Sequence, residues 1–162
     1  MSTETSNAAR LGYQWCRALA QSHYENFPVA SRLLPRQLRD PIAAIYAFAR
    51  TADDIADEGD ISRQLRLHRL REMETALDAV EDGGADNTPL FQALADTITR
   101  YRLPVDLFRD LLSAFRQDVS KTRYADFDEL MDYCSRSANP VGRLMLYLTG
   151  QVSDSSFVTV SY

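Results

Sequence analysis

The stretch that decides the fold is Asp40-Pro-Ile-Ala-Ala-Ile-Tyr-Ala-Phe-Ala-Arg-Thr-Ala-Asp-Asp-Ile-Ala-Asp57. Asp40 offers a side chain suited to a helix N-cap, and Pro41 suits the first helical position because proline has no N–H to leave unsatisfied. The sequence therefore predicts a helix that begins at Asp40-Pro41 and ends before Gly59.

One narrow face of this predicted helix is polar. Steps of four, three and four residues relate Tyr46, Arg50, Asp53 and Asp57, so all four lie on one side at about 100° per residue. The other positions are almost all Ala, Ile or Phe. A helix that is apolar nearly all round is normally buried, and unpaired buried charge is costly. We therefore expect the polar stripe to face a polar cavity.

The stripe has a chemistry that suits a metal ion and a phosphate. Asp53 and Asp57 repel each other at a spacing of four residues, and Asp54 adds a third carboxylate. A hard cation such as Mg²⁺ would relieve this repulsion, since it binds one or two carboxylates together with substrate phosphates. Arg50 suits a diphosphate through its forked donors. A solvated face with Arg50–Asp53 and Arg50–Asp54 ion pairs is the alternative interpretation.

Helices are predicted along most of the remaining chain as well. Ser62, Thr88-Pro89, Pro104 and Asp126 each precede an apolar run at helical spacing. A last apolar helix is expected from Val141 to Leu148. No pair of alternating strands is joined by a hairpin turn, so the predicted class is all-α.

Composition narrows the classes of protein. With 162 residues, 45% hydrophobic and 25% charged, the chain fits one globular domain and not a collagen-like or disordered protein. A net charge of -5 argues against nucleic-acid binding. We see no secretory signal, and the longest apolar run, Pro41 to Ala49, is too short to cross a bilayer. Cys16 and Cys134 fit reduced thiols, so a cytoplasmic location is expected.

Three segments together resemble a known family. They are the run Tyr46–Asp57 quoted above, the upstream run His23-Tyr-Glu-Asn-Phe-Pro-Val-Ala-Ser-Arg-Leu-Leu-Pro35, and the run Tyr133-Cys-Ser-Arg-Ser-Ala-Asn-Pro-Val-Gly-Arg143. In this order they resemble the squalene/phytoene synthase family. Their residues are most similar to those of its bacterial hopanoid branch, the squalene and hydroxysqualene synthases. The resemblance extends from about Tyr13 to Gly150.

The resemblance implies an all-helical isoprenoid (terpenoid) synthase fold and a head-to-head prenyl transferase. Such an enzyme acts on presqualene or farnesyl diphosphate with Mg²⁺, in a pocket where aromatic faces stabilise carbocations. The matching positions imply metal binding and catalysis by Asp53 and Asp57 with help from Asp54, and a place for Tyr133 near the reacting centre. They also imply substrate binding by His23, Phe27, Tyr46, Arg50 and Asp118. Asp118 and Tyr124 resemble positions that the family keeps near its diphosphate channel, and a solvated turn at a helix C-terminus is the alternative interpretation of these two residues.

The sequence departs from the family pattern in its last part. Synthases of this kind use a second aspartate-rich helix of the form Asn-x-x-x-Asp, and no such motif is present. We therefore expect residues 1–150 to form the N-terminal part of a synthase domain, a fold truncated to its N-terminal half. Residues 151–162 are expected to be a disordered or out-of-family tail. We expect an N-terminal half of this kind to be inactive by itself. The alternative is a non-catalytic helical module that binds a partner or a prenyl lipid.

Two kinds of partner contact also follow as expectations. A truncated face would expose apolar surface and favour self-association. The basic stretch of Arg63, Arg66, His68, Arg69 and Arg71 could contact an anionic membrane, with a peripheral location at the inner membrane. Its alternative is a solvated helix face balanced by Glu72 and Glu74.

Overall fold

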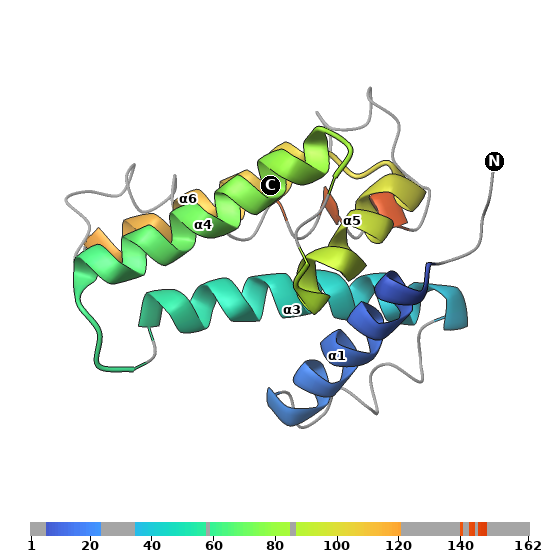
Figure 1. Cartoon of the computed structure of the whole chain (residues 1–162), viewed down its shortest axis with the longest axis horizontal. Coiled ribbons are helices and arrows are strands. Elements are labelled where there is room, and N and C mark those ends of the chain that lie inside the picture. The colour runs from blue at the N-terminus through green and yellow to red at the C-terminus, as the bar shows by residue number, and fades with distance from the viewer. Residues whose placement is uncertain are drawn as a thin grey trace.

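A computed structural model describes residues 6–23, 35–57, 59–84 and 87–120, together with residues 140, 143–144 and 146–148. Its elements are α1 (Asn7–His23), α3 (Arg36–Asp57), α4 (Arg63–Glu81), α5 (Pro89–Tyr101) and α6 (Val105–Ser120) (Figure 1). Over these described ranges the structure has no strand, so the all-α prediction is confirmed. No described helix is both long enough and apolar enough to cross a bilayer.

Several helix boundaries lie where the sequence predicts them. The Ser62 hydroxyl accepts a hydrogen bond from the Leu65 N–H at 3.1 Å, which caps the start of α4. The Thr88 hydroxyl caps α5 in the same way, with Pro89 at its first turn. Arg102 ends α5 in the left-handed conformation, with φ 54°, before Pro104 leads the chain into α6.

The predicted start of the polar-striped helix is wrong. α3 begins at Arg36, so Pro41 lies inside the helix. Because proline has no N–H, it cannot bond the carbonyl of Gln37 four residues earlier. The Tyr101 hydroxyl of α5 donates to that carbonyl at 3.0 Å. Asp40 forms an ion pair with Arg17 of α1. A tertiary contact thus satisfies the one carbonyl that Pro41 leaves without its helical partner, and the ion pair holds this end of α3 against α1.

The helix α1 is not among the helices expected from the sequence. Its buried side carries Ala9, Tyr13, Cys16 and Ala20, all at 5% exposure or less and at steps of four, three and four residues. Gly12 brings α1 very close to α5: a Cβ at this position would lie 2.4 Å from the Pro89 carbonyl oxygen. The Ser6 hydroxyl, which accepts from the Ala9 N–H at 3.1 Å, is the one local signal for the helix start.

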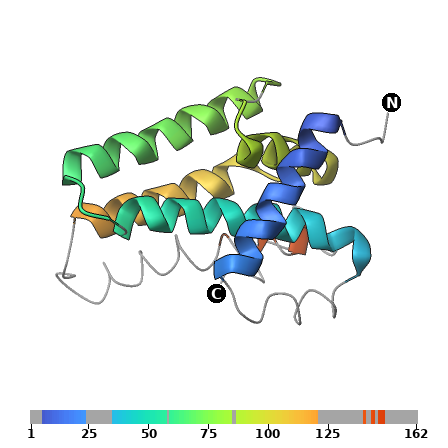
Figure 2. The ribbon, with the colours of Figure 1, turned by 60° about the horizontal axis from the view of Figure 1, so that its bottom comes forward.

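The core is arranged around α3, which contacts α1, α4, α5 and α6 (Figure 2). Phe48, at the middle of α3, is fully buried. Its ring packs edge-on against the rings of Phe91 and Phe108, with distances between ring centroids of 6.2 Å and 5.1 Å. Such edge-to-face contacts add to the free energy gained by burying the rings. Phe48 therefore joins α3 to both α5 and α6.

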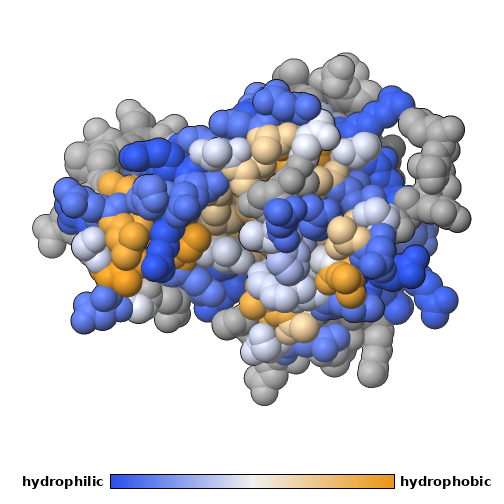
Figure 3. Space-filling view, viewed as in Figure 1, coloured by the Kyte–Doolittle hydropathy of each residue, from blue (hydrophilic) through white to orange (hydrophobic). Residues whose placement is uncertain are grey.

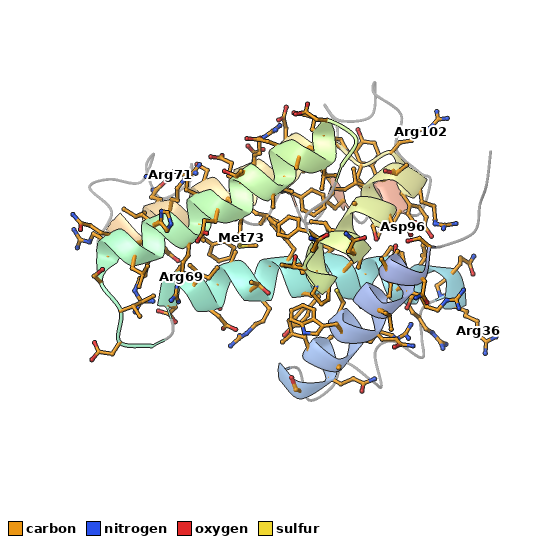
Figure 4. All side chains as sticks on the ribbon, viewed as in Figure 1. Arg36, Arg69, Arg71, Met73, Asp96 and Arg102 are labelled. Atoms are coloured by element: carbon orange, nitrogen blue, oxygen red, sulfur yellow. The ribbon has the colours of Figure 1, made fainter. Side chains whose placement is uncertain are left out.

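The face seen in Figure 3 is mostly hydrophilic, with separate apolar patches. A surface hollow of about 440 Å³ is lined mainly by apolar residues of α1, α4 and α5, among them Trp15, Met73 and Phe91. Figure 4 shows Met73 on the side of α4 that faces α3. Trp15 is 40% exposed beside this hollow.

Candidate functional site

The polar stripe of α3 lies on the accessible side of an otherwise buried helix. Arg50 and Asp53 have side chains that are 29% and 44% exposed, and Asp57 is exposed. On the opposite side, Ala44 and Ala52 are fully buried. The 3.6-residue period thus separates the helix into a packed face and an acidic face, as the sequence predicts.

Arg50 is shared between two of the carboxylates. Its Nη2 lies 3.0 Å from Asp54 Oδ1, and its Nη1 lies 3.7 Å from Asp53 Oδ2. Both ion pairs of the solvated-face interpretation are therefore present. Pairs of this kind on an exposed helix face contribute little to stability. They also leave the guanidinium at the accessible face, where an anionic ligand can compete for it.

Asp118 brings a further carboxylate to this face from a different helix, α6. The pKa of Asp53 is raised, first by partial burial of its carboxyl group. Arg50 acts in the opposite direction, and the negative charges of Asp57, Asp54 and Asp118 raise the pKa further. Of the described charged groups that shift the pKa of Asp53, three are carboxylates that raise it and one is a guanidinium that lowers it. The fold therefore concentrates negative charge here.

The donor set fits a hard cation that is completed by phosphate. Over the described residues, no three His, Cys, Asp or Glu side chains converge to form a metal cage. Mg²⁺ does not require one, because it commonly takes one or two carboxylates and fills its remaining positions with water and substrate phosphates. Oxygen ligands that repel one another on one helix face suit that mode of binding.

Arg66 has a structural role that its place in the sequence does not predict. From α4, its Nη1 donates to the carbonyl of Ile55 at 3.0 Å, and its Nη2 donates to the carbonyl of Gly59 at 2.6 Å. The guanidinium thus lies against the C-terminal end of α3. No local signal separates Arg66 from its basic neighbours, since only the folded α3–α4 arrangement brings these carbonyls to it.

The expectation that Glu72 and Glu74 balance the positive charge of the basic stretch is correct only in part. His68 lies 3.7 Å from Glu72, one helical turn away. Glu74, however, pairs with Arg116 of α6 at 3.0 Å. The interpretation of Glu74 as a partner of the basic stretch is therefore wrong: its place on α4 turns it toward α6.

The remaining predicted site residues differ in how far the structure describes them. Tyr46 is half-buried and packs against the core. His23 is the last residue of α1, and its side chain lies outside the described part. The predictions for Phe27, Tyr124, Tyr133, Cys134 and the tail 151–162 also fall outside the described residues. The other cysteine, Cys16, is a buried free thiol.

Comparison with known proteins identifies the family. The model of the squalene/phytoene synthase family matches residues 20–159. The chain belongs to this family. It is 44% identical to the hydroxysqualene synthase of Zymomonas mobilis over 124 residues, which are 75% of this chain and 40% of that protein. It is 33% identical to the phytoene synthase of Mycobacterium bovis over 144 residues, which are 89% of this chain and 46% of that protein.

Solved structures show the same relationship. The squalene synthase of Alicyclobacillus acidocaldarius superposes with a TM-score of 0.82 at 38% identity, over 96% of this chain and 60% of that one. A dehydrosqualene synthase in complex with a ligand gives a TM-score of 0.78 at 26% identity, over 90% of this chain and 50% of that one. The fold is therefore that of the isoprenoid synthases. The chain spans less than half the length of the two curated relatives above.

Proposed function

We propose that this family member supplies one of the two acidic surfaces of a head-to-head prenyl synthase of squalene or hopanoid biosynthesis. We call this surface, formed by Asp53 and Asp57 of α3 with Asp118 of α6, the acidic wall. The substrate would be presqualene or farnesyl diphosphate. The observation that carries the proposal is that Asp118 of α6 joins the Asp53 and Asp57 carboxylates of α3, with Arg50 among them. The names of the relatives, hydroxysqualene, squalene and phytoene synthases, support the choice of chemistry.

Each residue of the stripe has a distinct task in this proposal. Asp53 and Asp57 hold Mg²⁺ and Asp54 assists, while Arg50 binds diphosphate oxygens through its two Nη groups. Mg²⁺ would neutralise the charge that develops on the departing diphosphate. Tyr46 lies beside the same group, and Asp118 lines the diphosphate channel. His23 and Phe27 line the substrate entrance, and Tyr133 presents an aromatic face to the carbocation.

We further propose that the 162 residues by themselves do not turn substrate over. One acidic wall supplies only part of the ligands needed to neutralise a diphosphate, and the sequence contains no Asn-x-x-x-Asp motif for a second wall. The alternative is a helical module that binds a prenyl lipid without catalysis. Self-association through exposed apolar surface, and peripheral membrane contact through exposed basic side chains of α4, belong to this same proposal.

Pyrophosphate binding tests the acidic wall directly. Titration calorimetry of the purified chain with inorganic pyrophosphate should give binding that requires Mg²⁺. We expect Asp57→Asn to weaken it by about 10-fold or more, because one of two metal-binding carboxylates loses its charge. Asp106→Asn is the matched control, since Asp106 pairs with Arg109 near the start of α6. Equal affinity in the wild type and Asp57→Asn would contradict the proposed site.

A second assay addresses turnover. Diphosphate release from presqualene diphosphate and farnesyl diphosphate is measured with the purified chain and Mg²⁺. We expect no release above background. Release that Asp53→Ala abolishes would show that this chain is itself a complete catalyst.

A further inference from the structure

The last turn of α3 has an unfavourable distribution of charge. The final carbonyls of a helix have no partners within the helix, and they carry the negative end of its dipole. Basic side chains usually occupy this turn, but α3 has none there. It has Asp54 and Asp57 instead, with Asp53 just before them. Left alone, this turn would fray, because its carboxylates repel both one another and the helix end.

Arg66 provides from α4 the cation that α3 lacks. Its two Nη groups reach the carbonyl of Ile55, inside the last turn, and the carbonyl of Gly59, beyond the helix end. Gly59 has φ +81°, the left-handed conformation in which a chain commonly leaves a helix. A guanidinium can hold two acceptors at once in a fixed geometry, which an ammonium cannot do as well.

We propose that Arg66 is a positioning residue for the acidic wall. By binding the carbonyls of Ile55 and Gly59, it keeps the last turn of α3 helical, so that Asp57 stays one turn from Asp53 on the same face. The effect on ligand binding rests on the proposed function, whereas the effect on the helix end does not. Arg66 acts through the backbone of α3 and does not touch the diphosphate.

Hydrogen exchange of the unliganded chain tests the helix end. In Arg66→Ala, peptides that span residues 50–61 should exchange faster than in the wild type, while peptides from α5 should not change. Arg71→Ala is the matched control, because Arg71 is an exposed arginine of the same helix and lies on the side of α4 away from α3 in Figure 4. Unchanged exchange in residues 50–61 would overturn the proposal. Faster exchange throughout the chain would also overturn it, since it would indicate a general role in stability.

Pyrophosphate binding with Mg²⁺ then separates positioning from direct contact. We expect Arg66→Ala to weaken binding by about 10-fold or more, as is typical when a group that orients metal ligands is lost, and Arg71→Ala to leave binding unchanged. Arg66→Lys should recover part of both the exchange protection and the affinity, because one ammonium reaches one carbonyl. Weaker binding with normal exchange would show that Arg66 contacts the ligand itself, and would overturn the proposal. If the wild type bound no pyrophosphate but Arg66→Ala still loosened the helix end, the proposed function would fail and the positioning role would stand.

Discussion

The two ends of α3 differ in how their charged and polar groups find partners. At the N-terminal end, Asp40 pairs with Arg17, and the Tyr101 hydroxyl binds the carbonyl that Pro41 leaves free. Burial there, with the nearby charge of Asp40, raises the pKa of the Cys16 thiol to about 12. At the C-terminal end, carboxylates gather around Arg50, and a helix-capping cation has to come from α4.

This contrast distinguishes a structural end of α3 from the end at which we propose that ligand binds. At the first end, Asp40 and the Gln37 carbonyl each have a partner on another helix, which favours the folded state. The second end concentrates like charge, which costs stability by itself and would become favourable on the proposed binding of a cation together with an anion. Residues that break the rules of local consistency in this way are expected at functional sites.

The largest effect on stability is expected at the middle of α3, where the packed face is deepest. Phe48→Ala removes a fully buried ring that contacts Phe91 and Phe108, and should lower the free energy of unfolding by about 3–5 kcal/mol. Urea unfolding followed by circular dichroism measures it. Phe48→Leu should cost distinctly less, because it leaves a smaller cavity. A loss below about 1 kcal/mol for Phe48→Ala would show that the packed face is not the source of stability.

A smaller loss is expected where α1 crosses α5. Gly12→Ala places a methyl group 2.4 Å from the Pro89 carbonyl oxygen and 2.9 Å from the Ala93 nitrogen, so the two helices must separate. We expect a cost of roughly 1–3 kcal/mol in the same urea experiment. Gly84→Ala is the control, since its added carbon would meet the Ala79 carbonyl oxygen at an ordinary 3.5 Å. Equal stability of the two variants would contradict the close crossing.

The smallest expected effect on stability is a gain, and it arises at the C-terminal end of α3. The pKa of Asp53 is raised in the fold, so its protonated form is favoured there, and stability falls as pH rises through that raised pKa. Asp53→Asn should therefore stabilise the chain near neutral pH, by less than about 1 kcal/mol because the group is partly exposed. The difference in melting temperature between variant and wild type should disappear below about pH 4, where the ordinary aspartate also protonates. A destabilised variant at neutral pH would show that Asp53 serves the fold.

The sequence predicts the packed and acidic faces of α3 well because both depend on a local period. Helix starts at Ser62 and Thr88 are also predicted correctly, since each cap involves neighbours three residues apart. The start of α3 is wrong because the partner of the Gln37 carbonyl is Tyr101, 64 residues away.

The parts of the site that could not be predicted depend on tertiary contacts. The interactions of Arg66 and Glu74 arise only when α4 packs on α3 and α6. The helix α1 is a missed prediction, because its buried residues Ala9, Tyr13, Cys16 and Ala20 recur at helical spacing, although only Tyr13 among them is large. Only the family resemblance points to Asp118, since its place in the sequence gives no sign that it acts on Asp53.

The partly exposed Trp15 has an optical consequence. It is the single tryptophan of the chain, and it lies on α1 beside the outer hollow, on a different helix from the carboxylates. Its emission therefore reports solvent access at this hollow, beside the crossing of α1 and α5. A fluorimeter should detect the opening of that crossing early in denaturation, yet record little change when an anion and a metal occupy the acidic face.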